Sequence, residues 1–346
     1  MKKTMLPLLL VLLLAAILIT GCSKKSNDLP QYLAKIGLIG SVGGFNDHGF
    51  NQAALQGLQA GTLVFPFYAQ ARNSSDTGAY RTNMNYFLQN NYDLIISLGF
   101  EMKDLTIQSA RQNPMLDFAL LDVEQDSLPS NLRCVAYQVD QASFLCGFLA
   151  AYWAQFKDPS QPVAGYVAGP DIPEIRQFEV SYLKGVAYFN TYYGKSVQTA
   201  GLNADSFNDS LQGAQLAGNL ISEGADVIFA FAGKTGNGAL YKVLQEGKWG
   251  IGVDVDQFVS IPEVGNILLS SCMKRLDLSV YDLMFNLYHD NFQGGQVFYG
   301  NLSNNMVDLA PFHQFDSQIP DSIKDELDII KIGIQNGTIP TGWPEK

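Results

Sequence analysis

The chain has 346 residues, of which 47% are hydrophobic and 16% charged, so it can bury a sizeable core and a disordered body is excluded. A formal net charge of −11 repels a phosphate backbone, so we expect no nucleic-acid partner. The three histidines and four cysteines show no CxxC or HxxxH spacing, so we expect no metal site and no cofactor. The length exceeds what one core usually holds, which predicts two lobes.

The N-terminus has the pattern of a lipoprotein signal peptide. Residues 1–21 begin with lysines, continue with an apolar run and end with small residues before Cys22. The sequence ITGC at 19–22 resembles a lipobox, whose cysteine is diacylated and becomes the new N-terminus. The alternative is an ordinary secretory signal with a chance cysteine. We expect residues 22–33 to be a lipidated tether that holds the protein on the extracytoplasmic face of the cell membrane.

The other three cysteines are expected to be buried thiols. Cys134, Cys146 and Cys272 lie far apart in apolar runs. Such cysteines usually act as small hydrophobic residues. The sequence therefore predicts no disulfide framework.

From Ala34 onward, apolar runs of strand length alternate with amphipathic segments of helix length. This alternation is typical of parallel sheets that are covered on both faces. Before the breaker segment KDPSQP, the predicted strands are Lys35–Ile39, Leu63–Phe67, Leu94–Leu98, Phe118–Asp122 and Val135–Val139, and the predicted helices are Phe50–Ala60, Tyr80–Gln89, Asp104–Arg111 and Gln141–Phe156. After it, the predicted strands are Val163–Val167, Val197–Gly201, Val227–Phe231 and Gly250–Asp254, and the predicted helices are Pro173–Tyr193, Ser210–Glu223 and Ala239–Glu246.

The C-terminal part reads as a return crossing between the lobes. It contains a strand at 268–274, a helix at Leu276–Tyr288, a hairpin-like stretch at 296–310 and a last helix between Pro320 and Gly337. These elements predict an α/β fold with two doubly wound parallel-sheet lobes and a ligand cleft at the carboxyl ends of the strands. The expected lobes are 34–140 plus 275–292 and 141–274 plus 293–346.

A polar and aromatic stretch follows the first predicted strand, where the sequence reads SVGGFNDHGFNQ at 41–52. It has more hydrogen-bonding groups than a strand-to-helix loop needs. Other charged side chains follow further strands, namely Asp122, Asp254 and Lys274. Because the carboxyl ends of parallel strands share one edge of a sheet, we expect these side chains to meet in the cleft. There Lys274 offers donors to ring nitrogens or to a ribose oxygen.

These groups suit a ligand with vicinal hydroxyls and an aromatic ring, which is the description of a nucleoside. The carboxylates of Asp47, Asp122 and Asp254 can each accept two hydroxyl donors of a sugar. The rings of Phe50 and Phe207 can stack on the two faces of a flat ring. The sequence therefore favours a nucleoside ligand.

Each of these residues also has a simpler interpretation. An aspartate after a strand is often a helix N-cap. Phe50 and Phe207 also fit the core, and Asp254 could simply end its strand. Lys274 could be a solvated surface charge or a partner of Asp277. The nucleoside hypothesis depends on the convergence of the groups and not on one position.

Patterns of enzymes and nucleotide-binding folds are weak in this chain. GLIGSVGG lacks the GxGxxG spacing, and Ile228 stands where the first glycine of a P-loop belongs before GKT. No G-x-S-x-G elbow is present. His48 beside Asp47 could act as a base in a nucleoside hydrolase-like reaction, although such a histidine is usually just solvated. We therefore expect no enzyme and no catalytic residue.

Five blocks of the sequence resemble, in the same order, the basic membrane protein (BMP) family of nucleoside-binding lipoproteins, the substrate-binding components of ABC transporters. They read SVGGFNDHGFNQ, YVAGPDIPEIRQFEVSYLKGV, GADVIFAFAGKTGNGAL, GVDVDQ and SSCMKRLDLSVYD. The resemblance covers essentially the whole mature chain. It implies a type I periplasmic-binding-protein fold, in which a hinge of several strands lets two α/β lobes close around a ligand. It also implies a purine nucleoside as ligand.

The resemblance also implies the ligand-binding positions. The family's opening motif covers the loop after the first strand, and the other blocks cover later strand ends. Phe207 is the less certain second stacking ring, with Phe178 as its fallback. The implied positions are Asn46, Asp47, Phe50, Asn51, Asp122, Phe207, Gly233, Asp254 and Lys274.

Four positions depart from the family pattern. Asn46 stands where many members carry Asp, and Lys234 stands where Gly is frequent. Cys272 and Met273 change the approach to Lys274. Lys234 is hypothesised to favour a more anionic or oxidised ligand.

The leading hypothesis is a lipid-anchored solute-binding protein of an ABC importer, which works with permease and ATPase subunits, is held to the membrane by its acyl anchor and is monomeric. A first alternative is a sensory binding module of the same fold for another small polar solute. A second alternative is a nucleoside-cleaving enzyme that uses Asp47 and His48.

Overall fold

The computed structural model describes residues 32–344. The predicted signal peptide at 1–21, the lipidation of Cys22 and nearly all of the predicted tether lie outside these residues. From Ala34 onward the chain forms one compact unit. Within residues 32–344, no helix combines the length and apolar character that a membrane crossing requires.

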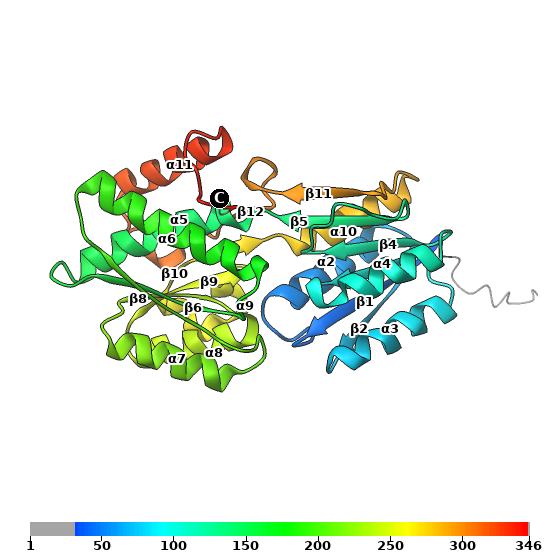
Figure 1. Ribbon diagram of the computed structural model, residues 1–346, viewed down its shortest axis with the longest axis horizontal. Coiled ribbons are helices and arrows are strands. Elements are labelled where there is room, and N and C mark those ends of the chain that lie inside the picture. The colour runs from blue at the N-terminus through cyan, green and yellow to red at the C-terminus, as the bar shows by residue number, and fades with distance from the viewer. Residues whose placement is uncertain (1–31, 345–346) are drawn as a thin grey trace, which may run out of the picture. The chain divides into compact units, whose positions relative to one another are not determined.

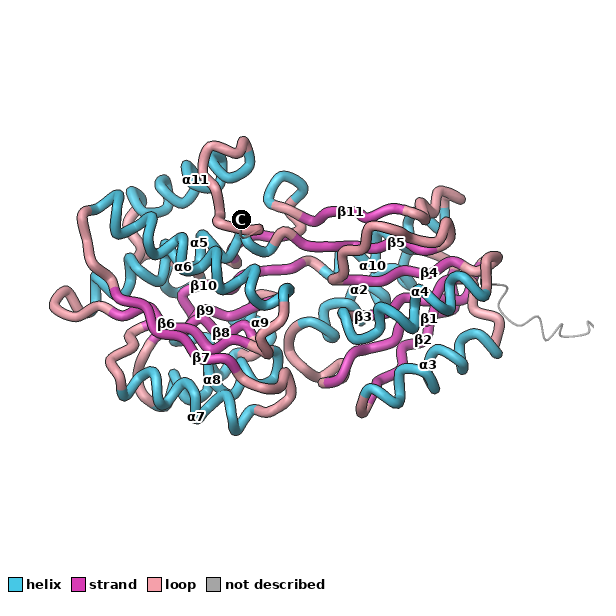
Figure 2. Tube along the Cα trace, in the orientation of Figure 1, coloured by secondary structure: helices cyan, strands magenta, loops and turns pink. Residues whose placement is uncertain are grey.

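Two six-stranded sheets, one in each lobe, form the framework (Figures 1 and 2). Every strand pair is parallel except one antiparallel pair at the edge of the second sheet. The strands of the first sheet, in spatial order, are β11 (Gln296–Gly300), β5 (Leu132–Tyr137), β4 (Asp117–Leu121), β3 (Leu94–Leu98), β1 (Ala34–Val42) and β2 (Phe67–Ser74). Those of the second are β12 (Val307–Leu309), β10 (Leu268–Lys274), β9 (Trp249–Asp254), β8 (Val227–Phe231), β6 (Val163–Ala168) and β7 (Gln198–Asn203).

Helices cover both faces of each sheet, so the central strands are buried along their whole length. Every residue of β3 and β8 is buried, which explains why their sequences are apolar except for Ser97. The first lobe contains α2 (Phe50–Val64), α3 (Thr77–Gln89), α4 (Lys103–Gln112) and α10 (Leu276–Tyr288). The second contains α5 (Val139–Lys157), α6 (Pro173–Tyr193), α7 (Ser210–Ser222), α8 (Gly233–Gln245), α9 (Gln257–Ser260) and α11 (Asp321–Gln335). Short 3-10 turns lie at Phe100–Met102, Pro262–Ile267, Leu302–Asn304 and His313–Phe315.

Three chain crossings join the lobes. They lead from β5 to α5, from β10 to α10 and from β11 to β12. The predicted α/β fold with two doubly wound sheets and a multi-strand hinge is therefore confirmed. The three cysteines expected to be thiols are all buried and unbridged.

The predicted lobe boundary at residue 293 is wrong. Strand β11 pairs in parallel with β5, so residues 296–300 belong to the first lobe and the chain crosses after Gly300. The predicted hairpin at 296–310 is also wrong, because β12 pairs with β10 in the other sheet. The partners of both strands lie far away in the sequence, where local pattern gives no information.

The predicted strand at Leu63–Phe67 is wrong as well, because α2 continues to Val64 and β2 starts at Phe67. The helix ends there because Phe65 precedes Pro66, which disfavours a helical backbone; Phe65 has φ −103° and ψ 140°.

The helix predicted at Ala239–Glu246 begins earlier than expected, because residues 233–238 form the first turns of α8. Their glycines let α7 and α8 pack closely, since a Cβ on Gly238 would lie 1.9 Å from the carbonyl oxygen of Ser210.

Candidate ligand-binding site

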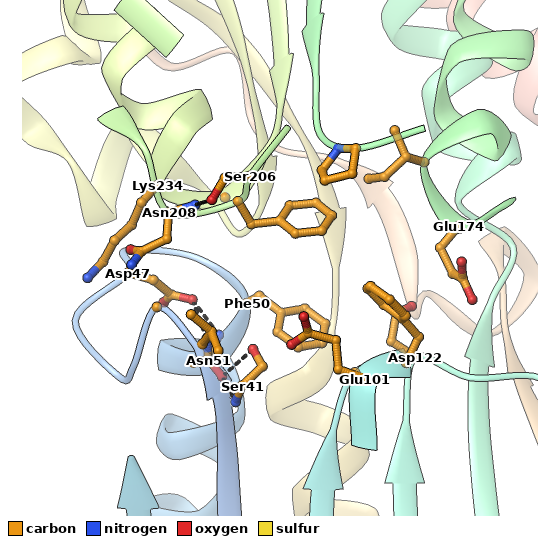
Figure 3. A pocket seen from close by; sticks show the side chains of 18 of the residues that line it. Ser41, Asp47, Phe50, Asn51, Glu101, Asp122, Glu174, Ser206, Asn208 and Lys234 are labelled. Atoms are coloured by element: carbon orange, nitrogen blue, oxygen red, sulfur yellow. Dashed lines mark hydrogen bonds between the residues drawn. The ribbon is translucent and has the colours of Figure 1, made fainter. Parts of the chain in front are cut away.

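A cavity of about 600 Å³ lies at the carboxyl ends of the strands, and residues of both lobes line it (Figure 3). Of the predicted site residues, Asn46 is the exception, since it is exposed and does not line the cavity. The structure brings the other eight together: Asp47, Phe50, Asn51, Asp122, Phe207, Gly233, Asp254 and Lys274.

The carboxylate of Asp47 holds the start of α2. One of its oxygens accepts from the backbone N–H groups of Gly49 (3.1 Å) and Gln52 (3.0 Å). The other accepts from the backbone N–H (2.8 Å) and side-chain amide (2.9 Å) of Asn51. These four bonds fill the usual capacity of a carboxylate. Asp47 thus satisfies backbone N–H groups at the start of α2 from two residues before the N-cap residue Gly49, and little capacity is left for sugar hydroxyls.

Asn51 is also largely occupied by the protein. Its side-chain oxygen accepts from the backbone N–H of Ser41 (2.7 Å) and from the Ser41 hydroxyl (3.0 Å), as the dashed lines in Figure 3 show. Asp47 and Asn51 thus fix the loop after β1 against the first turn of α2, and this places the ring of Phe50 at the cavity wall.

Lys274, at the end of β10, is the centre of the site. Its ammonium lies 2.8 Å from a carboxylate oxygen of Asp122 and 3.7 Å from one of Asp254. The same nitrogen lies over the rings of Phe50 (5.4 Å to the centroid) and Phe178 (5.3 Å). Lys274 is buried, so the interpretation of a solvated charge is wrong. Asp277 has another partner, the guanidinium of Arg275.

Asp122 and Asp254 reach Lys274 from the two lobes with the same unusual backbone. Each directly follows or ends a strand, and their φ angles of 66° and 67° turn the chain out of the sheet. Burial raises the pKa of Asp254 to about 6; the Lys274 ammonium opposes this rise, and the carboxylates of Asp122 and Asp47 add to it. Burial alone would lower the pKa of Lys274, but the carboxylates of Asp122 and Asp254 outweigh it and raise that pKa. Lys274, Asp122 and Asp254 thus form a triad in which Lys274 and Asp254 are buried and Asp122 is partly exposed.

Aromatic rings form much of the remaining wall. Phe207 packs over Gly169, where a Cβ would lie 2.3 Å from its ring, and its ring centroid is 6.5 Å from that of Phe100 in an edge-on arrangement. Phe178, the fallback for Phe207, is buried and stacked on Phe231 at 5.4 Å. Phe178 therefore forms part of the cavity wall beside Lys274, whereas Phe207 keeps a half-exposed face.

The lining also contains acidic residues that sequence reasoning did not select. Glu101 lies three residues after the predicted strand Leu94–Leu98, which is the signal that could have found it, and it accepts a hydrogen bond from the Tyr80 hydroxyl. In all, seven carboxylates and two ammonium groups line the cavity. This excess disfavours a ligand with phosphate groups. The acidic lining residues that were not predicted are Asp76, Glu101, Glu174 and Asp205.

The histidine considered as a base, His48, does not lie in the cavity. His48 is exposed, its Nδ1 lies 2.8 Å from the carbonyl oxygen of Ser260, and it is not a lining residue. In the described part of the chain, no group of three or more His, Cys, Asp or Glu side chains is arranged to hold a metal ion. The pairing of Asp47 and His48 in an enzyme thus lacks the geometry that it requires.

Solved structures with the same fold include solute-binding proteins. The ABC-transporter solute-binding protein of Aeropyrum pernix K1 superposes with a TM-score of 0.82 at 21% identity, over 89% of this chain and 94% of that one. A transcriptional activator of the comK gene from Bacillus halodurans superposes with a TM-score of 0.69 at 18% identity, over 89% and 99%. At these identities the likeness shows the fold alone.

Relatives by sequence cover nearly the full length. The CD4+ T-cell-stimulating antigen of Listeria monocytogenes is 29% identical over 100% of both chains. The ABC transporter nucleoside-binding protein BmpA of Lactococcus lactis is 28% identical over 95% of this chain and 97% of that protein. Basic membrane protein A1 of Borrelia garinii is 28% identical over 96% and 95%. Residues 35–341 match the Bmp model, and the chain therefore belongs to this family of PnrA-like ABC transporter substrate-binding proteins.

Proposed function

We propose that this protein is a lipid-anchored, extracytoplasmic solute receptor that delivers a purine nucleoside to an ABC importer and does no covalent chemistry. The observation that carries the proposal is the cavity in which Lys274 lies between Asp122 and Asp254, with the rings of Phe50 and Phe207 in the same lining. The name of the Lactococcus lactis relative, a nucleoside-binding protein, supports it.

In this proposal the ribose lies at the charged triad and the base lies at the aromatic rings. The ribose hydroxyls donate to the carboxylates of Asp122 and Asp254, and the Lys274 ammonium donates to a ribose oxygen. Stacking on an aromatic ring contributes about 1–3 kcal/mol per base. Asp47, Asn51 and Gly233 shape the walls and contribute fewer direct bonds, because the protein already occupies the two side chains.

The proposed partners follow from the family. A permease and an ATPase would take over the nucleoside from the closed protein, which acts as a monomer, and the diacylated Cys22 would supply the membrane anchor. Two acyl chains suffice for stable anchoring, whereas one does not.

The excess of carboxylates in the cavity indicates a neutral nucleoside rather than a nucleotide.

Lys234 is the second lining cation, at the edge of the site near Asn208 (Figure 3). We expect Lys234→Gly to weaken binding of 6-oxopurine nucleosides such as inosine about tenfold relative to adenosine, since a charged hydrogen bond contributes about 1.5–3 kcal/mol. Competition binding with the two nucleosides measures this ratio. An unchanged ratio of inosine to adenosine affinity would show that Lys234 does not select the base.

Nucleoside affinity is expected to fall as the pH drops below about 6. The pKa of Asp254 is about 6, above its ordinary value of 3.8, and the carboxylate accepts hydroxyl donors best when ionised. Affinity at pH 5 should therefore be about tenfold lower than at pH 7.5. The free energy of unfolding of the ligand-free protein should instead be higher at low pH. A carboxyl group with a raised pKa in the folded state stabilises that state when it is protonated. This stabilisation by Asp254 is lost as the pH rises from about 4 to 6.

Isothermal titration calorimetry at several pH values measures both the affinity and the proton uptake. In the Asp254→Asn variant, affinity should be lower at pH 7.5 and should no longer depend on pH between 5 and 7. A pH dependence that persists in this variant would assign the titration to another group.

A thermal-melt panel tests the proposed function itself. Purified protein, freed of bound ligand by unfolding and refolding, is heated with adenosine, guanosine, inosine, uridine, ribose and free bases. A ligand at about a hundred times its dissociation constant stabilises the folded state by roughly 2.7 kcal/mol, which is several degrees. A shift with purine nucleosides but not with ribose or uridine supports the proposal. No shift with any of them would refute it.

A further inference from the structure

The loop between β1 and α2 bridges to the second lobe. We call residues 43–49 the bridging loop; it lies beside α9 (Figure 2). The Nδ1 atom of His48 lies 2.8 Å from the backbone carbonyl oxygen of Ser260, and the Ser260 hydroxyl donates to the backbone carbonyl oxygen of His48 at 2.8 Å. Since a carbonyl oxygen only accepts, Nδ1 carries the proton. Two reciprocal hydrogen bonds thus tie the lobes together at this point.

A second and buried connection runs from the bridging loop into the second sheet. The side-chain amide of Asn237 donates to the backbone carbonyl oxygen of Asp47 at 2.8 Å. The side-chain amide of Gln257 donates to the oxygen of Asn237 at 2.9 Å, and the oxygen of Gln257 accepts from the backbone N–H of Val253 at 3.0 Å. Both ends of this series of hydrogen bonds are backbone groups of fixed polarity, so the side-chain amides of Asn237 and Gln257 have only one possible orientation.

This series of hydrogen bonds ends beside Asp254, a residue proposed to bind the ligand. Val253 directly precedes Asp254, whose backbone has positive φ. Gly49 of the bridging loop lies against the same carboxylate, because a Cβ placed on Gly49 would be 3.5 Å from an Asp254 oxygen. The position of the bridging loop and the orientation of the Asp254 carboxylate therefore depend on each other.

The side chains that form these connections between the lobes do not line the cavity. His48, Asn237, Gln257 and Ser260 are absent from its lining, whereas Asp47 and Asp254 belong to it. Asn237 and Gln257 are only 8% and 2% exposed, so their bonds are protected from water while the lobes are together. Opening the lobes would break the bonds to Asp47 and Ser260 and would expose Asn237.

We infer that these residues form a closure latch, in which Asn237 and Gln257 are positioning residues that hold Asp254 in place and slow ligand release. The latch comprises His48, Asn237, Gln257 and Ser260. It acts through the approach of the lobes and not through contact with the ligand. Only the identity of the released ligand rests on the proposed function.

Two variants test the latch. Asn237→Asp replaces the amide donor with an oxygen that faces the Asp47 carbonyl, but keeps an acceptor for Gln257. Ser260→Ala removes one rim hydrogen bond and leaves the core intact, so it remains informative if Asn237→Asp folds poorly. Loss of one hydrogen bond should raise the dissociation rate of inosine about two- to tenfold in Ser260→Ala, and tenfold or more in Asn237→Asp, with little change in the association rate.

Asn190→Ala is the matched control. Its side chain bonds to both backbone groups of Val197 inside the second lobe, so the variant should lose stability without a change in the dissociation rate. Displacement of radiolabelled inosine gives the rates, and thermal melting gives the stability. Unchanged dissociation rates in both latch variants, with stability lowered as in the control, would overturn the latch.

Small-angle scattering separates the latch from the proposed function. The Asn237→Asp/Ser260→Ala double variant should show a larger radius of gyration than the wild type without added ligand, since open lobes are favoured. This holds even if inosine does not bind and the proposed function fails. An identical radius of gyration for double variant and wild type would contradict the latch independently of any ligand.

Discussion

Replacing Lys274 with methionine is expected to abolish measurable nucleoside binding and to lower the free energy of unfolding by about 3–5 kcal/mol at neutral pH. Lys274 is buried between carboxylates of both lobes, so its loss leaves Asp122 and Asp254 close together without a counter-charge. The pKa of Asp254 should then rise further. The deficit in stability should shrink as the pH falls from 7 towards 5, because a protonated Asp254 no longer repels Asp122.

Lys248→Met is the matched control for this prediction. The Lys248 ammonium lies 2.8 Å from a carboxylate oxygen of the buried Asp226, in the second lobe and outside the cavity lining. The control should lower the melting temperature but leave nucleoside affinity within about twofold of the wild type. Calorimetry and thermal melts at pH 5 and 7 measure both. A Lys274→Met protein that still binds purine nucleosides with wild-type affinity would disprove the role of the triad.

Replacing Phe207 with alanine should weaken purine nucleoside binding by about 5- to 150-fold, the equivalent of 1–3 kcal/mol of stacking. The ring lines the cavity in the second lobe and packs over Gly169, so its loss removes an apolar wall without disturbing the triad. Leucine at this position should recover part of the affinity through apolar contact. The expected order of affinity is wild type, Phe207→Leu, Phe207→Ala.

Phe156→Ala serves as control for the loss of an aromatic ring. Phe156 is 54% exposed, stacks on Tyr152 and lies outside the cavity lining. Its removal should leave affinity unchanged. If Phe207→Ala binds purine nucleosides as tightly as Phe156→Ala does, Phe207 is not a stacking ring, and Phe178 becomes the candidate.

Several predicted elements match the structure at both ends. They include the buried strands Leu94–Leu98 and Val227–Phe231, which are mostly apolar runs, and the helices Pro173–Tyr193 and Leu276–Tyr288. The strand β11 was assigned to the wrong lobe, because pairing with β5 is a tertiary choice that its own residues do not encode. The same limit explains the incorrect hairpin at 296–310.

The candidate site was predictable where a strand end gave the position. Asp122, Asp254 and Lys274 end strands of parallel sheets, so one rule of topology placed them together. Asn46 was selected because it lies in the polar loop after the first strand and in the family motif, but it is exposed and outside the cavity lining. Asn237 was missed, since a polar residue in a glycine-rich segment gives no sign that its partner is a backbone carbonyl of the other lobe.

A crystal structure of the protein grown with inosine would show whether the triad and the aromatic rings hold the nucleoside. We expect the ribose hydroxyls within hydrogen-bond distance of the carboxylates of Asp122 and Asp254, the Lys274 ammonium on a ribose oxygen, and the purine ring against Phe50 and Phe207. Inosine bound with its ribose away from Lys274, or an empty cavity at saturating inosine, would contradict this expectation.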